Sequence, residues 1–112
     1  MLADTIEHVF PWPTEFDPPP YRVVDPPVPV IVHIATAISQ PAAHPATVIP
    51  LRVRAEGLAL DVQVPGTLRA WARTTGSGWI CCLCFTIPTG NGRGGLDVVD
   101  QWCPAAAVRP VK

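Results

Sequence analysis

The residues of this sequence best suited to chemistry are its four cysteines, Cys81, Cys82, Cys84 and Cys103. Four thiolates can hold Zn²⁺ in a tetrahedral site. Zinc sites usually place two or more residues between paired ligands, however, and the neighbours Cys81 and Cys82 would point to opposite faces of a strand. We therefore interpret the cysteines as small hydrophobic core residues and expect neither a metal nor a cofactor. A metal site of Cys82, Cys84 and Cys103 is the alternative.

No arrangement typical of an enzyme is visible in the sequence. A cysteine nucleophile needs a nearby base, yet all three histidines precede residue 50 and all four cysteines follow residue 80. The run Gly90–Gly95 satisfies the dinucleotide-binding pattern G-x-G-x-x-G, but such a site also needs an acidic residue about 20 positions later. Only 17 residues follow Gly95. We expect a hairpin loop at this run, no catalytic residue and no enzymatic activity.

Arginine side chains alternate outward in two segments predicted to be strands, and one of these segments also carries a tryptophan. Guanidinium groups neutralise phosphates and an indole stacks on a base, so such a face is typical of small barrels that bind single-stranded nucleic acid. The same pattern is found where arginines pack on a tryptophan at a solvent-exposed face, or where a protein partner binds. Nucleic acid is therefore the alternative partner, through Arg52, Arg54, Arg69, Arg73 and the loop residue Arg93 around Trp71.

Composition divides the chain into two parts. The 112 residues include 15 prolines, too many for a helical bundle because proline removes a backbone donor and clashes with the preceding turn. Residues 1–50 hold eleven of these prolines, five acids and one arginine, whereas residues 51–112 hold every glycine, seven bases and four acids. We predict an acidic, proline-rich arm over residues 1–46 and a mildly basic β-barrel over residues 47–112.

The second part alternates apolar and polar residues with a period of two, which is typical of half-buried strands. The turn pair Pro65–Gly66 separates two such runs. Residues 79–87 are apolar throughout, so this strand is expected to be covered on both faces. The pattern predicts a mainly β fold, a small barrel of five to six strands with a short 3₁₀ turn at 104–107. We expect the strands at 51–55, 58–64, 67–74, 79–87, 96–103 and 108–111.

Two runs resemble the second half of SH3-like barrels: Gly78–Cys84, with the sequence GWICCLC, and Trp102–Val111, with the sequence WCPAAAVRPV. The resemblance implies a strand, a hairpin, a 3₁₀ turn and a closing strand, with Ile80, Cys82 and Cys84 facing inward; an OB-like barrel is the other small-barrel possibility. In style the chain also resembles small proteins of high-GC bacteria that have no assigned activity. The acidic loop and tyrosine-rich segment of peptide-binding SH3 domains are missing, so their ligand preference does not carry over.

The arm contains one segment, residues 30–38, that is apolar on both faces and is expected to form a strand. If Ile80 and Cys82 line the barrel, the Trp79 face of the same strand needs a cover. We therefore expect the arm to add a strand to the barrel or to cover one face, either on its own barrel or exchanged in a homodimer.

These features favour a non-enzymatic interaction, adaptor or assembly protein that binds a protein partner or itself. The aromatic residues expected to contact the partner are Tyr21, Trp71, Trp79 and Trp102. A small nucleic-acid-binding accessory protein is the alternative. The sequence shows neither a secretory signal nor an apolar run of membrane-spanning length, so we expect a cytoplasmic protein without a membrane partner.

Overall fold

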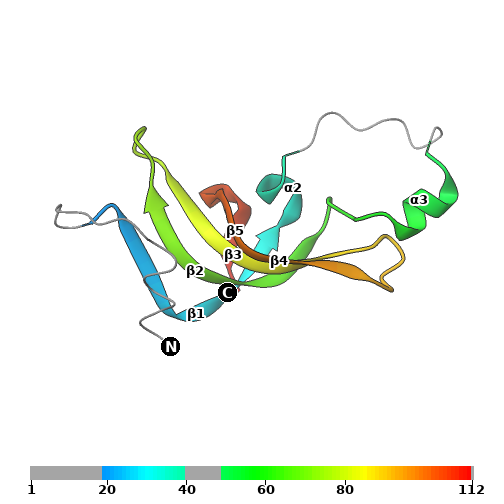
Figure 1. Cartoon of the computed structure of the whole chain (residues 1–112), viewed down its shortest axis with the longest axis horizontal. Helices are drawn as coiled ribbons and strands as arrows, with labels where there is room; N and C mark the ends of the chain where they lie inside the picture. The colour runs from blue at the N-terminus through cyan, green and yellow to red at the C-terminus, as the bar shows by residue number, and fades with distance from the viewer. Residues whose placement is uncertain (1–18, 40–48, 112) are drawn as a thin grey trace.

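The computed structural model describes residues 19–39 and 49–111 of the chain. Five antiparallel strands form one sheet in the order β4-β3-β2-β1-β5, which curls into a half-barrel (Figure 1). The predicted mainly β fold is therefore confirmed, and it is consistent with a small β-barrel. The elements are β1 (Tyr21–His33), α2 (Ile34–Ala37), α3 (Leu51–Glu56), β2 (Gln63–Arg73), β3 (Trp79–Pro88), β4 (Gly95–Pro104), the 3₁₀ turn η2 (Ala105–Ala107) and β5 (Val108–Pro110).

The predicted arm does add a strand to the sheet. This strand, β1, lies between β2 and β5. It begins at Tyr21 rather than at residue 30 and ends at His33, because Ile34–Ala37 turn into one helical turn that buries Ile34 and Ala37. Strands β2, β3 and β4 follow as two hairpins, and η2 connects β4 to β5 as the sequence predicted.

The predicted hairpin of residues 51–55 and 58–64 is wrong, as is the predicted turn at Pro65–Gly66. Leu51–Glu56 form the helix α3, whose first bond runs from the N–H of Arg54 to the carbonyl of Pro50 at 3.0 Å. Leucine, arginine, alanine and glutamate are good helix formers, so their propensity prevails over the alternating pattern. Pro65 fits within β2 because β2 pairs there with β1 alone and begins to pair with β3 at Gly66.

The main hydrophobic core lies on the inner face of the curled sheet. Its fully buried side chains come from β1, β3, β4 and α2, and the packing of α2 against η2 closes one end. At Gly66 the strands approach so closely that an added Cβ would lie 2.7 Å from the carbonyl oxygen of Cys84 and 2.8 Å from Cγ2 of Val32. The largest fully buried residues are Val32, Ile34, Cys81, Cys82, Leu83 and Cys103, all of the inner face except Cys82.

The inner face of β3 is the opposite of the one implied by the SH3-like register. Cys81, Leu83 and Phe85 point into the main core, whereas Cys82 belongs to a second, smaller cluster on the outer face. The expectation that Ile80, Cys82 and Cys84 line the barrel is therefore wrong. The alternating pattern shows that odd and even residues of a strand lie on opposite faces, but it does not show which of the two sets faces inward.

Extra residues interrupt the pairing in three strands of the sheet, β1, β2 and β4. The register shifts between Val23 and Val28 in β1, at Arg69 in β2, and at residues 99–100 in β4. An extra residue moves all following side chains to the other face and increases the local twist. In β2, Leu68 therefore packs on the inner face, Ala70 on the outer face, and Trp71 on the inner face again.

We expect Leu83→Ala to lower the free energy of unfolding by roughly 2–5 kcal/mol, because Leu83 is fully buried and its truncation leaves a cavity. Val99→Ala is the control, since Val99 is 71% exposed on β4 and should change stability by no more than about 0.5 kcal/mol. Urea denaturation of both variants measures the difference. Equal stabilities would contradict the placement of Leu83 in the core.

Candidate functional site: an apolar groove beside a tryptophan hollow

The outward face predicted for Arg69, Trp71 and Arg73 does not exist as one surface. Trp71 packs against the main core on the inner side of the sheet, whereas Arg69 reaches Asp100 and lies beside Cys82 of the outer cluster. The cause is the extra residue at Arg69, which no alternation pattern reveals.

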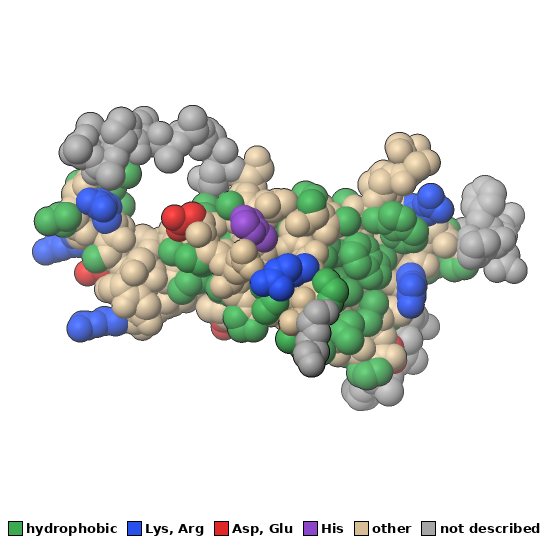
Figure 2. All heavy atoms as spheres, turned by 180° about the vertical axis from the view of Figure 1, so that it is seen from behind, with side chains coloured by type: hydrophobic (Ala, Val, Ile, Leu, Met, Phe, Trp, Pro, Cys, Tyr) green, Lys and Arg blue, Asp and Glu red, His purple; other side chains and the backbone are tan. Residues whose placement is uncertain are grey.

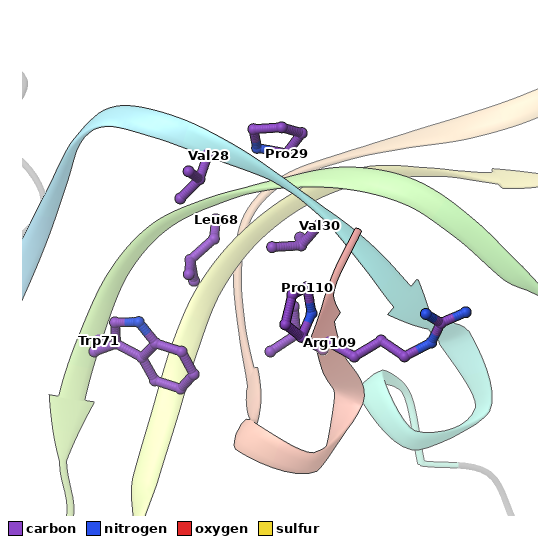
Figure 3. A pocket seen from close by; sticks show the side chains of 8 residues that line it. Val28, Pro29, Val30, Leu68, Trp71, Arg109 and Pro110 are labelled. Atoms are coloured by element: carbon purple, nitrogen blue, oxygen red, sulfur yellow. The ribbon is translucent and has the colours of Figure 1, made fainter. Parts of the chain in front are cut away.

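An apolar groove of about 340 Å³ lies beside Trp71, between β1, β2 and β5 (Figure 3). Val28 pairs with Leu68 across β1 and β2, and Val30 pairs with Pro110 across β1 and β5, so the two walls are held by the sheet. Its charged lining residue, Arg109, contributes its stem while its guanidinium donates to Oε1 of Gln63 at 3.0 Å. The lining residues are Val28, Pro29, Val30, Leu68, Trp71, Val108, Arg109 and Pro110.

A second recess, the tryptophan hollow, has a volume of about 360 Å³ and is lined by Arg22, Trp71 and Trp79. The two indoles meet edge to face with ring centroids 6.4 Å apart. Arg73 covers Trp79, its guanidinium carbon 5.1 Å from the ring centroid, which is within the range of a cation–π contact. Trp79 is 40% exposed even so. Because Trp71 lines both recesses, the groove and the hollow lie on either side of this one side chain.

The four aromatic residues predicted to bind a partner are separated into two pairs. Trp71 and Trp79 line the hollow. Tyr21 and Trp102 instead pack on the outer face, around Ala70 and Cys82. The structure therefore brings together only half of this predicted set, and Tyr21 and Trp102 cover the outer cluster.

The predicted nucleic-acid residues are also dispersed. Arg52 and Arg54 lie on α3, and the β3–β4 turn that carries Arg93 is bound to this helix, since the N–H of Asn91 donates to the carbonyl of Ala55 at 2.7 Å. Arg52, Arg54 and Arg93 therefore belong to one end of the molecule. Basic side chains are visible at the end where α3 lies in Figure 2. Trp79 begins β3 at its other end, so the α3 arginines do not surround the indoles.

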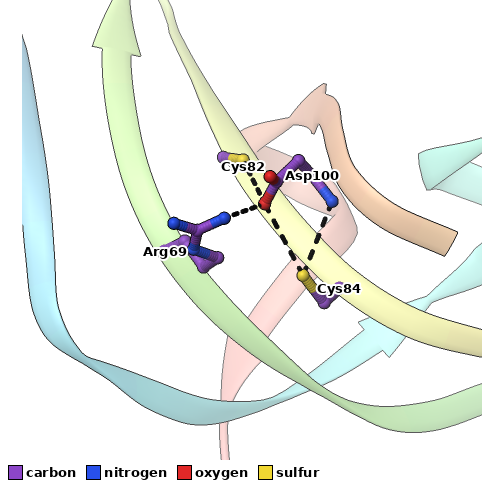
Figure 4. A network of polar contacts seen from close by, with 4 residues as sticks. All are labelled: Arg69, Cys82, Cys84 and Asp100. Atoms are coloured by element: carbon purple, nitrogen blue, oxygen red, sulfur yellow. Dashed lines mark hydrogen bonds and ion pairs between the residues drawn. The ribbon is translucent and has the colours of Figure 1, made fainter. Parts of the chain in front are cut away.

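Arg69 belongs to a polar cluster on the outer face of the sheet (Figure 4). Its guanidinium donates to Oδ1 of Asp100, an ion pair that raises the pKa of Arg69 through this hydrogen bond. The thiols of Cys82 and Cys84 each donate to the same oxygen at 3.7 Å, and the N–H of Asp100 donates to Sγ of Cys84 at 3.5 Å. Arg69 is thus already neutralised, which removes it from any phosphate-binding surface.

The structure does not bring together the residues of the alternative metal site, Cys82, Cys84 and Cys103. Cys103 lies in the inner core opposite Cys81, whose thiol donates to the Cys103 carbonyl at 3.6 Å, while Cys82 and Cys84 contact Asp100 on the outer face. Within residues 19–39 and 49–111, no three His, Cys, Asp or Glu side chains are placed to hold a metal ion.

Burial raises the pKa of the Cys81 thiol to about 12, so this side chain is neutral at pH 7.

Sequence reasoning missed Arg22, Asp100 and most of the groove. The groove residues come from both predicted parts of the chain, and no local pattern indicates that Val28 and Pro110 will share a surface. Asp100 has a φ of +54°, a conformation favoured by glycine, asparagine and aspartate over other residues. Residues 96–103 read Leu-Asp-Val-Val-Asp-Gln-Trp-Cys, and the break in their alternation at Val98 and Val99 was the available signal for an irregularity there.

The high thiol pKa values predict a loss of stability at alkaline pH. Burial raises the pKa of Cys81 and of Cys82 from 9.0 to about 12. Below pH 9 both thiols are neutral in the folded and unfolded chains, whereas above it only the unfolded chain ionises. The free energy of unfolding should therefore fall as pH rises from about 9 toward 12. Urea denaturation at several pH values measures this slope, which should be shallower in Cys82→Ala; an unchanged slope would contradict the assignment to Cys82.

Substitutions at Asp100 separate its ion pair from its backbone conformation. Asp100→Gly and Asp100→Ala both remove the carboxylate that binds Arg69. Alanine must also adopt the left-handed φ, at a cost of roughly 1 kcal/mol relative to glycine. We expect Asp100→Ala to be the less stable variant by this amount in thermal or urea denaturation, with Asp100→Asn the least affected. Equal stabilities of the Gly and Ala variants would show that the conformation carries no cost.

No described helix has the length and hydrophobicity of a membrane span. No protein-family model matches the chain, and neither a curated protein nor a solved structure matches it. The groove and the tryptophan hollow are therefore the observations on which a function can be argued.

Proposed function

We propose that this protein is a non-enzymatic interaction module that binds an extended apolar segment of a protein partner along the groove and the tryptophan hollow. The observation that carries the proposal is that the two recesses lie on either side of Trp71. Two such recesses suit an extended segment, whereas a small-molecule pocket is usually a single enclosed cavity.

The groove favours contact through side chains. Pro29 and Pro110 lack backbone N–H groups, so the walls offer few donors for adding a further strand. Aromatic and proline-containing grooves of this kind bind proline-rich segments, whose polyproline II conformation is already extended and loses little entropy on binding. Val28, 41% exposed, and Trp79 are the exposed apolar side chains that such a segment would cover.

The surroundings support binding rather than catalysis. Among the described residues, the lining of groove and hollow is apolar apart from Arg22 and Arg109. Arginine stays protonated at physiological pH and therefore does not serve as a general base. A carboxylate, histidine or thiol that could act as acid, base or nucleophile does not line either recess within the described part of the chain.

The proposal includes an SH3-like type of barrel in the cytoplasm. The 3₁₀ turn between β4 and the last strand β5 supports this type, whereas the inner face of β3 is the opposite of the one that the resemblance implies. Fold type alone does not determine the ligand. The partner segment belongs either to another protein or to a second copy of this chain.

The test selects peptides that bind the full-length chain from a display library and measures their affinities by calorimetry. Val28→Asp places a charge in the groove and should weaken binding at least tenfold, because a buried carboxylate without a partner is costly. Val99→Asp is the matched control, since Val99 is exposed on β4 outside the groove. Equal affinities of the wild type and Val28→Asp would overturn the proposal.

Nucleic acid remains a second candidate because of one observation, the edge-to-face indoles flanked by Arg22 and Arg73. Such a site can stack on one base and neutralise adjacent phosphates. This candidate predicts that a single-stranded oligonucleotide binds at low salt, weakens steeply as salt rises, and is lost in Trp79→Ala. Arg93→Gln at the α3 end is the control and should bind normally. Fluorescence anisotropy that detects no binding at low salt would exclude this candidate.

A further inference from the structure

We propose that the groove and hollow have a resident ligand, the acidic and proline-containing segment 1–18 of the same chain. This inference rests on the proposed function and identifies what a partner peptide must displace. Residues 1–18 lie outside the described part of the structure. The place where this segment is attached, its charge and its apolar residues all fit the groove and the hollow.

The segment is attached beside the hollow. The N–H of Arg73 donates to the carbonyl of Pro20 at 2.8 Å, and Arg73 itself covers Trp79. From this point β1 runs along the surface, with Arg22 at the hollow and Val28–Val30 at the groove. From Pro20 to Val30 the strand spans about 33 Å at about 3.3 Å per residue. Eighteen extended residues reach about 60 Å, so the segment can fold back over the whole site.

The charges of segment and site are complementary. Segment 1–18 contains four acids and no lysine or arginine. Arg22 lines the hollow and Arg109 lines the groove. The guanidinium of Arg73 lies over the exposed indole of Trp79. Each exposed ion pair between segment and site would contribute at most about 1 kcal/mol and would be screened by salt. The charges would therefore orient the segment, but they would not be sufficient to bind it. The acids are Asp4, Glu7, Glu15 and Asp17.

The segment also carries side chains suited to an apolar site. Residues 9–13 read Val-Phe-Pro-Trp-Pro, with two aromatic residues and two prolines in succession. On the side of the molecule seen in Figure 2, hydrophobic side chains gather toward the end opposite α3, with basic side chains at the margin. An aromatic residue followed by proline can occupy such a surface at a low entropic cost.

Tethering makes even a weak contact effective. A short flexible linker supplies an effective concentration of about 1 mM, so an intrinsic Kd of about 0.1 mM would leave the site closed roughly ten times as often as open. A partner peptide would then bind about tenfold more weakly than to an open site. The segment thereby sets a threshold that a partner must exceed.

The experiment uses the full chain with Phe10→Ala and Trp12→Ala combined, changes outside the described sheet. Affinity for a peptide selected on the groove should rise about tenfold in this variant, because its competitor is weakened. Without peptide, the NMR amide signals of Val28 and Val30 and the indole signal of Trp71 should shift relative to wild type. Thr5→Ala is the matched control within the same segment and should leave both readouts unchanged.

Each outcome separates this inference from the proposed function. Unchanged affinity and unchanged signals in the double variant would overturn the resident ligand, while a loss of binding in Val28→Asp would still support the groove. Signal differences that grow with protein concentration between about 10 and 500 µM would assign the occupant to a second copy and overturn docking within one chain. Differences independent of concentration and reduced by high salt would support it.

Discussion

The arrangement of this molecule depends on the interruption of strand pairing in β1, β2 and β4. The extra residues of β2 and β4, Arg69 and Asp100, form an ion pair on the outer face of β3, the strand between them. The same carboxylate accepts hydrogen bonds from two thiols of β3. Each extra residue interrupts the backbone hydrogen bonds of its own strand, but the two side chains stabilise each other across β3. The extra twist that they introduce helps the sheet to curl around its inner core.

The position of the groove and of the tryptophan hollow follows from this interruption. Without the extra residue at Arg69, Trp71 would lie on the face opposite Leu68, and groove and hollow would not share a residue. With it, Leu68 and Trp71 both turn inward, so the two modest recesses share the side chain of Trp71. The extra residue Arg69 therefore affects both faces of the sheet. It forms the polar cluster on the outer face and places Trp71 beside the groove on the inner face.

Much of the strand content was predictable, because continuous apolar runs and alternating patterns determine strands whatever their partners. Residues 79–87 are an example: they form most of β3. The pattern failed at Leu51–Glu56, where helix propensity prevails, and beyond Arg69, where one added residue reverses the faces. The groove was not predictable, since it joins β1 and β5 through long-range pairing. The tryptophans were the part of the site that residue type alone indicated.

The two walls of the groove differ in how firmly they are held. One wall is built on β1 and β2, long strands that pair over most of their length. The other is β5, three residues long, which among residues 19–39 and 49–111 pairs with Val30, Ile31 and Val32 alone. A wall fastened over so short a span can shift while the core stays intact, as local openings generally begin where the fewest contacts must break. The groove thus combines a stiff side with a compliant side, so the proposed ligands could differ in bulk on the β5 side while keeping the same register along β1.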